Sequence, residues 1–377
     1  MTAVLSDLRI LEFAAIGPVP WCGMVLADLG ASVIRIERPA SGAERDTLGA
    51  VRRGRTLVEL DLKSAEGREA ALQLVGRADI LLEGLRPGVM ERLGLGPQDC
   101  MARNPRLVYG RMTGWGQTGP LAQQAGHDIN YIALSGALHA IGTADKPVPP
   151  LNLVGDFGGG GAFLAIGVLA AAWQARACGR GQVVDAAMVD GSAVLMAMVF
   201  SRMVMGQWAD RRASNALDGG VPWYDTYRTR DGQFVAVGAL EPQFYDELLQ
   251  RLGLAGQLPD RQDPAHWPEI RRRFEEAFGS RTRQAWAQHF AASDACVTPV
   301  LSLAEAMAHP HMQARGVFMP WQAGQVPAAA PVFDGVRPPA TAPARQSSMA
   351  DALERWSLGG VRPTCAPAVN SPIVPET

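Results

Sequence analysis

The stretch Gly126–Tyr131 places an imidazole next to a carboxylate, as His127 and Asp128. Histidine can gain or lose a proton near neutral pH, which few unperturbed side chains do. Aspartate is a favourable N-cap residue, and apolar residues follow at helical spacing, so the pattern predicts a helix that begins at Asp128. The pair is therefore a candidate for proton transfer at a helix start.

Two more acidic residues complete a set that could move protons. Asp156 lies in the glycine-rich segment 155–161, which predicts a turn, and Glu241 follows the apolar run 234–237. A base, two carboxylates and a flexible backbone are the parts of a proton-transfer site. Taken singly, each part has a structural explanation, since a His-Asp pair often caps a helix and a lone glutamate is usually solvated. Whether these residues form a catalytic site therefore depends on the elements that surround them.

Composition favours a soluble globular protein that does not bind polyanions. The chain has 377 residues, of which 47% are hydrophobic and 19% charged, and this length suggests two domains. A net charge of −2 argues against a nucleic acid or an anionic membrane as partner. The cysteines are scattered, odd in number and lack C-x-x-C spacing, which predicts reduced thiols and a cytoplasmic location: Cys22, Cys100, Cys178, Cys296 and Cys365.

Two segments invite other interpretations. The apolar run 157–177 is almost long enough to span a bilayer, but it is rich in glycine and alanine and ends in Gln174 and Arg176. We expect a buried helix against a sheet, and no membrane association. His309 and His311 flank a proline without further ligands at suitable spacing, so we expect a turn and no metal site.

Residues 8–112 alternate strand and helix patterns, with Ser64 as the predicted N-cap of a helix over 65–75. This rhythm predicts an α/β fold with a parallel, Rossmann-like sheet. The turn after the first strand, residues 14–20, carries two prolines instead of G-x-G-x-x-G, so we do not expect NAD binding.

The second half predicts a smaller α/β domain. A hairpin around Asp231 and Gly232 precedes helices over 243–252, 269–278 and 283–291, and Ser302 opens a capping box. We therefore predict a large domain over residues 1–206, a linker over 207–222 and a small domain over 223–322. Residues 323–360 are expected to return to the large domain, and residues 361–377 to form a disordered tail.

A long, ordered series of motifs identifies a family. It runs from about residue 5 to about residue 320, and with these motifs the chain resembles the family III coenzyme A-transferases. The motifs include Ile16-Gly17-Pro18, Ala27-Asp28-Leu29-Gly30-Ala31, Arg35-Ile36-Glu37-Arg38-Pro39, Asp61-Leu62-Lys63, Glu83-Gly84-Leu85-Arg86-Pro87-Gly88, Glu91-Arg92-Leu93-Gly94, Thr113-Gly114-Trp115-Gly116-Gln117, Gly155-Asp156-Phe157-Gly158, Leu217-Asp218-Gly219-Gly220, Tyr224-Asp225-Thr226-Tyr227 and Glu241-Pro242.

The resemblance implies an interlocked homodimer whose active site lies between the large domain of one subunit and the small domain of the other. It also implies an acyl-CoA thioester as substrate, with the CoA on the large domain. Arginine binds phosphate well, which suits the three phosphates of CoA. The matching positions for substrate and CoA are Ile16, Arg38, Leu62, Arg92, Gly126, Asp128, Tyr131 and Tyr224.

Within the family, the resemblance implies a racemase that interconverts (2R)- and (2S)-2-methylacyl-CoA through an enolate, with no cofactor and no metal. It assigns His127 to one face of the α-carbon and Asp156 to the other, and Glu241 orients His127. The enolate would lie near the backbone N–H groups at the helix start. Unperturbed His and Asp differ by about 2.6 pKa units, or roughly 3.5 kcal/mol, so we expect burial to raise the Asp156 pKa.

Two alternatives remain at this stage. A CoA transferase of the same fold would use Asp156 as a nucleophile that forms acyl anhydrides. The Asp156 turn suits both reactions, whereas the transferases generally lack a histidine at the position of His127. The second alternative is a non-catalytic acyl-CoA-binding protein, which would have no need for His127, Asp156 and Glu241 together.

Overall fold

The computed structural model describes residues 3–39 and 49–358. The chain divides into two compact units. The first comprises Met1–Arg111, Leu164–Asp185 and Ala329–Thr377, and the second comprises Met112–Phe163 and Ala186–Ala328. These limits differ from the predicted domain limits at 206 and 223, and the predicted division stays a prediction. The expected tail over 361–377 lies outside the described residues.

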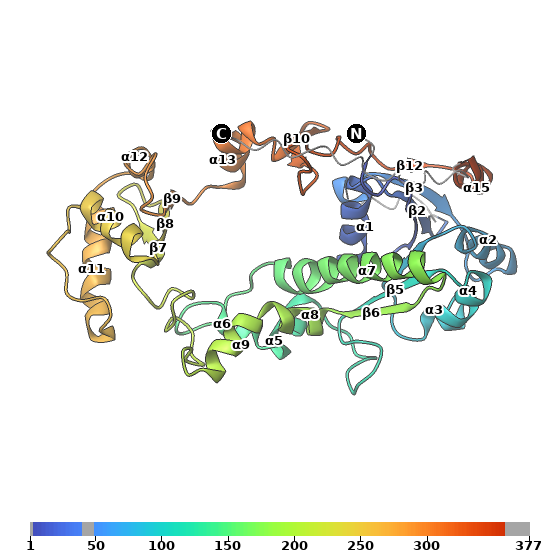
Figure 1. The fold of residues 1–377 in the computed structure, drawn as a ribbon, viewed down its shortest axis with the longest axis horizontal. Coiled ribbons are helices and arrows are strands. Elements are labelled where there is room, and N and C mark those ends of the chain that lie inside the picture. Colours follow the sequence, from blue (N-terminus) through green and yellow to red (C-terminus); the bar gives the residue numbers. More distant parts are fainter. Residues whose placement is uncertain (1–2, 40–48, 359–377) are drawn as a thin grey trace, which may run out of the picture. The chain divides into compact units, whose positions relative to one another are not determined.

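The first unit is built on a seven-stranded sheet with the order β12-β3-β2-β1-β4-β5-β6, in which the pairings from β12 through β5 are parallel (Figure 1). The order 3-2-1-4-5-6 is that of a Rossmann-type sheet. The predicted α/β fold with a parallel sheet is therefore confirmed. The strands are β1 (Arg9–Phe13), β2 (Ser32–Glu37), β3 (Arg55–Glu59), β4 (Ile80–Glu83), β5 (Val108–Thr113), β6 (Val183–Ala187) and β12 (Arg345–Gln346).

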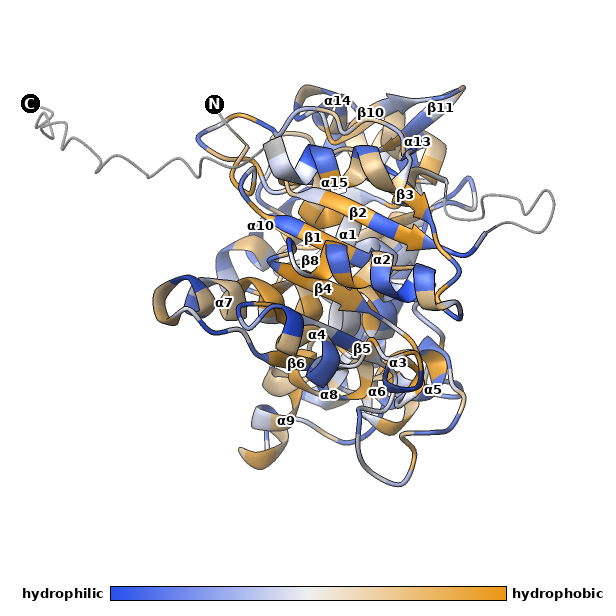
Figure 2. Cartoon of the chain, turned by 90° about the vertical axis from the view of Figure 1, so that its right-hand side faces the viewer, coloured by the Kyte–Doolittle hydropathy of each residue, from blue (hydrophilic) through white to orange (hydrophobic). Residues whose placement is uncertain are grey.

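Helices cover both faces of this sheet. The predicted N-cap Ser64 accepts from the N–H of Gly67 at 2.9 Å, as expected for a helix over 65–75. In Figure 2 the strands are mostly orange, whereas α2, which lies over one face, carries much blue on its outer side. The helices are α1 (Pro18–Asp28), η1 (Gly49–Arg52), α2 (Ala65–Val75), α3 (Val89–Arg92), α4 (Pro97–Arg103), α7 (Phe163–Cys178) and α15 (Met349–Leu358).

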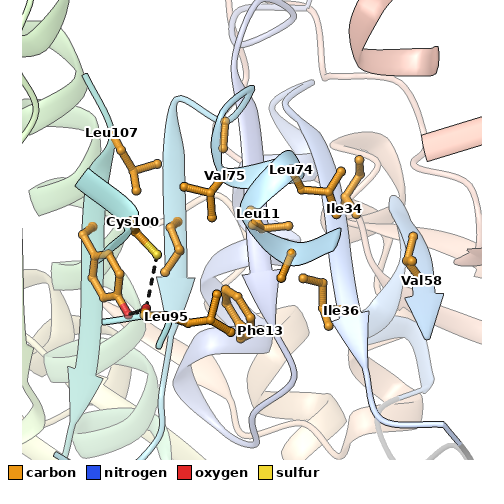
Figure 3. Close-up of a cluster of buried hydrophobic side chains, with 14 of the residues drawn as sticks. Leu11, Phe13, Ile34, Ile36, Val58, Leu74, Val75, Leu95, Cys100 and Leu107 are labelled. Carbon is orange, nitrogen blue, oxygen red and sulfur yellow. Dashed lines mark hydrogen bonds between the residues drawn. The ribbon is translucent and has the colours of Figure 1, made fainter. Parts of the chain in front are cut away.

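Successive side chains of each strand point to opposite faces of the sheet, so the two faces pack against different residues. Leu11 and Phe13 of β1 point into an apolar core shared with α2, α4 and α15, drawn in Figure 3. Trp356 of α15 joins this core, and β12 pairs with β3, so the described residues after 329 pack on the first unit. On the opposite face, Gly110 of β5 leaves room for Val168 of α7.

A buried ion cluster occupies the α1 face of the sheet. Glu12, which is fully buried, pairs with Arg35 and with Arg55, whose Nε lies 3.1 Å from the Glu12 Oε2. Arg35 also donates to the carbonyl of Ala15 at 3.3 Å, and Arg55 donates to the carbonyl of Pro20. The cluster therefore fixes the turn between β1 and α1, which contains the predicted CoA-binding residue Ile16.

The second unit begins with helices around the candidate site. Its first part comprises α5 (Asp128–Leu134), α6 (Ala137–Ala140), the π-helix η2 (Leu153–Ala162), α8 (Met188–Leu195) and α9 (Ala197–Val204). The predicted hairpin is confirmed as the antiparallel pair β7 and β8, around Asp231 and Gly232. The rest comprises β7 (Tyr224–Arg228), β8 (Phe234–Gly238), α10 (Pro242–Leu252), η3 (Pro264–His266), α11 (Trp267–Phe278), α12 (Arg283–His289), β9 (Val297–Pro299), α13 (Leu303–Ala308), α14 (Pro310–Ala314), β10 (Phe318–Trp321) and β11 (Gly324–Pro327).

Three local predictions were wrong. His127, not Asp128, is the N-cap of α5, and Asp128 is the first helical residue. The glycine-rich segment around Asp156 is not a turn but the π-helix η2, which runs on into α7. Glycine disfavours helix in isolation, but tertiary packing overrides that propensity here. His309 caps α14 rather than lying in a plain turn.

The glycines of η2 permit a close approach to α8. A Cβ at Gly159 would lie 2.6 Å from the backbone nitrogen of Ser192 and 3.0 Å from the carbonyl oxygen of Met188. The first distance is shorter than packed atoms allow and the second is at the limit, so only glycine permits this spacing. The π-helix is therefore held by backbone-to-backbone packing.

The predicted buried helix after Asp156 is buried on one face only. Leu164, Val168 and Ala171 are buried, whereas Ile166 and Trp173 are 62% and 80% exposed. By length and composition, Leu153–Cys178 meets the criteria for a membrane span, with a mean hydropathy of 1.6. The core helix of a soluble protein meets the same criteria, so a single such helix is weak evidence for a span.

The ion cluster predicts a large stability effect at Glu12. Glu12→Ala leaves Arg35 and Arg55 buried without their shared counterion, and loss of one partner of a buried ion pair costs about 3–5 kcal/mol. We expect a clear fall in the urea midpoint of unfolding, followed by circular dichroism. The control is Asp7→Ala, which removes an exposed carboxylate 2.7 Å from Arg176 and should change stability by less than about 1 kcal/mol. Equal midpoints for the two variants would contradict the account.

Candidate active site

His127 presents an exposed imidazole at the start of α5. Its backbone N–H donates to the Asn130 Oδ1 at 3.0 Å, which fixes the turn into the helix. The side chains of His127 and Asn130 form a reciprocal capping box at this helix start. Because the His127 side chain is exposed, the rest of its ring is accessible to a ligand.

Asp156 lies in the first turn of η2, which packs against α5. The Asn152 amide donates to the Asp156 Oδ2 at 3.2 Å, and the backbone N–H of Asp156 donates to the Asp128 Oδ2 at 2.7 Å. Asp156 is half-buried, whereas Asp128 is only 7% exposed. The structure thus brings His127, Asp128 and Asp156 together where two helices begin.

Burial raises the pKa of the Asp156 carboxyl above its usual value. The hydrogen bond from Asn152 opposes this shift, the negative charge of Asp128 adds to it, and the charge of His127 opposes it. Desolvation disfavours the charged form of a carboxyl group, whereas a neighbouring cation favours it. The sequence-based expectation that burial raises the Asp156 pKa therefore agrees with the structure.

A cavity of about 490 Å³ opens in the first unit at the carboxyl ends of β1 and β2. Its lining includes the predicted CoA-binding residues Arg38 and Leu62, together with Phe13, Ile36 and Lys63. Ligands of parallel α/β sheets bind beyond the carboxyl ends of the strands. Two basic side chains, Arg38 and Lys63, and two acidic ones, Glu37 and Asp61, line the cavity among apolar residues. The basic side chains suit a phosphorylated ligand.

Ion pairs of the first unit hold the neighbouring elements in place. Arg111 of β5 donates to Glu83 of β4 at 2.9 Å and to Glu91 of α3 at 2.8 Å. Arg92, the last residue of α3, is exposed beside Glu91. Ile16 is 78% exposed in the turn that the Glu12 cluster fixes. Both residues are therefore presented to solvent by rigid elements.

Gly126 and Tyr131 contact one another in the second unit. The Tyr131 hydroxyl donates to the Gly126 carbonyl, and the Tyr131 ring meets the Trp115 ring edge-on at 4.7 Å. Tyr131 is only 6% exposed, so it braces the turn before His127. A direct contact of Tyr131 with CoA stays a prediction.

Glu241 and Tyr224 lie in the small-domain part of the second unit. Glu241 is the exposed N-cap of α10, and Tyr224 begins β7 and lines a cavity of about 490 Å³ with Asp225 and Cys296. Among the hydrogen bonds and ion pairs of the described residues, none joins Glu241 to His127. The orienting role of Glu241 stays a prediction.

The described part of the chain contains no group of three or more His, Cys, Asp or Glu side chains that could hold a metal ion. Its four described cysteines are free thiols, as predicted: Cys22, Cys100, Cys178 and Cys296. Cys365 lies outside the described residues.

Sequence reasoning missed two groups at Asp156. Asn152 precedes it by four residues and donates to its carboxylate, and the Asp128 side chain accepts from its N–H. An i, i+4 spacing is a helical signal. The spacing of Asn152 and Asp156 was not recognised as this signal, because the glycine-rich segment predicts a turn rather than a helix.

The fold and the site define a class of α/β enzyme that binds ligands at the end of a Rossmann-type sheet. A profile of CoA-transferase family III matches residues 5–347, and the chain belongs to that family. It is 46% identical to mouse alpha-methylacyl-CoA racemase over 318 residues, which cover 84% of this chain and 82% of the relative. The human alpha-methylacyl-CoA racemase is 45% identical, over 84% of this chain and 82% of the relative.

A solved structure supports the fold. The chain is similar to a CAIB/BAIF family protein from Brucella suis, with a TM-score of 0.80 and 24% sequence identity. The match covers 95% of this chain and all (100%) of the other chain. At this identity the likeness concerns the fold alone, and it agrees with the predicted fold class.

Proposed function

We propose that the protein is a racemase that interconverts (2R)- and (2S)-2-methylacyl-CoA thioesters. The observation that carries the proposal is that the exposed His127 and Asp156 lie at neighbouring helix starts, and that the pKa of the Asp156 carboxyl is raised. Relatives that are 45–46% identical to the chain over 84% of its length are named alpha-methylacyl-CoA racemase. CoA is part of the substrate, and the proposed chemistry requires no other cofactor.

The reaction requires one base on each face of the α-carbon. One base takes the α-proton, the electron pair of the broken C–H bond moves to the thioester oxygen, and the other base returns a proton to the opposite face. In one direction His127 takes the proton and Asp156 supplies one, and in the other direction the roles are exchanged. The first hydrogen bond at the start of α5 runs from the Asn130 N–H to the His127 carbonyl at 2.8 Å, so the N–H groups of Asp128 and Ile129 precede it and suit the enolate oxygen.

The raised pKa of Asp156 supports a two-way reaction. Epimers at the α-carbon are close in energy, so a racemase works best when its two bases have similar proton affinities. Unperturbed, the two side chains differ by about 2.6 pKa units. Burial moves the Asp156 pKa toward that of histidine and so narrows the gap.

The cavity at Arg38, Leu62 and Lys63 is our candidate site for the CoA portion of the substrate. Two basic side chains suit phosphate groups, and an apolar floor of Phe13 and Ile36 suits a purine ring. Ile16 and Arg92 are exposed on neighbouring elements of the same unit. This arrangement supports an acyl-CoA substrate. We further propose a cytoplasmic location, as the scattered cysteines of the sequence indicate.

We also infer a homodimer in which Glu241 of one subunit orients His127 of the other. In support, α9 has no buried residue, and its large apolar side chains are exposed. Val204 is 91% exposed, and Met198 and Phe200 are each close to half exposed. Exposed apolar patches of this kind mark protein–protein contacts.

The first test of the proposed function separates racemase from transferase. In deuterium oxide, the enzyme should invert 2-methylacyl-CoA and place deuterium on the α-carbon, as seen by chiral chromatography and mass spectrometry. Hydroxylamine should trap no acyl group on Asp156 during turnover, because no anhydride forms. An Asp156 hydroxamate, together with acyl exchange between a free acid and CoA, would instead establish the transferase.

The second test addresses the shared site. His127→Ala and Glu241→Ala homodimers should each be nearly inactive, while co-expressed subunits should regain about one quarter of wild-type activity. The reason is that about half the dimers are hybrids, and each hybrid has one intact site if the two residues come from different subunits. Isolated hybrids, purified by two affinity tags, give the measurement, and hybrids as inactive as the parents would contradict the shared site.

A further inference from the structure

The Asp128 carboxylate faces η2 rather than open solvent. Its Oδ2 accepts the backbone N–H of Asp156 at 2.7 Å, and the side chain is only 7% exposed. Gly155 passes so close that a Cβ there would lie 2.5 Å from this oxygen. A carboxylate in this position is part of the packing between α5 and η2.

This hydrogen bond gives the Asp156 N–H an acceptor that η2 itself does not provide. The first backbone bond of the π-helix runs from the Phe157 N–H to the Asn152 carbonyl at 3.3 Å. The N–H of Asp156 precedes it and therefore has no acceptor within its own helix. Asp128 provides the acceptor from 28 residues earlier in the chain.

The negative charge of Asp128 is also favourable at the first turn of η2. It is the first residue of α5, and its carboxylate lies at the first turn of η2, so two helix N-termini face one negative charge. The elements packed against η2 carry four titratable side chains, namely Asp128 and Tyr131 on α5, His127 at its N-cap and Asp190 on α8. Of these, His127 and Asp128 act on the Asp156 carboxyl.

We propose that Asp128 is a positioning residue for Asp156, which it clamps by its hydrogen bond to the first turn of η2. This inference rests on the proposed racemase function. It differs from the direct CoA contact that the family resemblance implies for Asp128. In the proposed role, the carboxylate fixes the direction from which Asp156 meets the α-carbon, and its negative charge raises the proton affinity of that base.

Two substitutions separate the hydrogen bond from the charge. Asp128→Asn keeps an oxygen that can accept the Asp156 N–H but removes the charge, whereas Asp128→Ala removes both. The control is Asp190→Asn, which removes an exposed carboxylate from the other element packed against η2. Each variant is studied as the full chain, and circular dichroism reports that the protein is folded.

Hydrogen exchange followed by mass spectrometry reports the clamp without requiring activity. Asp128→Ala should speed exchange in the peptide that covers residues 153–162, while Asp128→Asn and Asp190→Asn should keep wild-type protection. In turnover, Asp128→Ala should lower kcat on the order of 10²-fold, the cost of a small misplacement of a catalytic group. Its KM should change little, because CoA binding is not involved.

The pH profile reports the charge. Removing a negative charge beside Asp156 lowers the pKa of that carboxyl, so Asp128→Asn should shift the acid limb of kcat/KM to lower pH. The shift should appear in both directions of racemisation, because the pair titrates with shared apparent pKa values. Asp190→Asn should leave the limb where it is.

Unchanged exchange in Asp128→Ala, or a rise in KM with kcat unchanged, would overturn the clamp in favour of a CoA contact. If Asp128→Ala does not fold, an unmoved acid limb in Asp128→Asn overturns the proposal. Faster exchange in a protein whose wild type does not racemise would refute the proposed function while supporting the clamp.

Discussion

The close packing of η2 on its neighbours is the constraint on which the candidate site depends. Gly159 lies where any Cβ would overlap the backbone of α8, and Gly155 lies where it would overlap the Asp128 carboxylate. These contacts place Asp156 in the first turn of the helix and beside α5. A single added methyl group at either glycine would push the helix away and change the geometry between Asp156 and His127.

Much of the framework could be predicted from sequence because its signals are local. The β-α-β rhythm of residues 8–112, the cap at Ser64 and the Asp231-Gly232 turn each follow from short-range preferences, and the structure contains all three features. The glycine-rich segment could not be predicted this way. Its helix exists because tertiary contacts outweigh glycine's low helix propensity, and only coordinates reveal such contacts. For the same reason, the spacing of the residues does not predict the hydrogen bond between the Asp156 backbone N–H and the Asp128 side chain, which are 28 residues apart.

The same scaffold can serve two reactions, because a carboxylate at a helix start can act as a base or as a nucleophile. The groups around Asp156 favour the base. Burial raises its proton affinity, which helps a residue that must both take and give a proton, whereas a nucleophile benefits from remaining ionised. In the proposed racemase reaction, the exposed His127 is the second proton-transfer group, for which acyl transfer through an anhydride has no need.

The central claim is that His127 and Asp156 serve opposite faces of the α-carbon. The most direct test is α-deuterium incorporation in deuterium oxide by His127→Ala and Asp156→Asn, starting from each pure epimer. Inversion should fall to background in both variants, because each direction needs both groups. Exchange without inversion should survive only for the epimer that faces the remaining base, and the surviving epimer should differ between the two variants. Substantial inversion by either variant, or loss of exchange from the same epimer in both, would contradict the assignment.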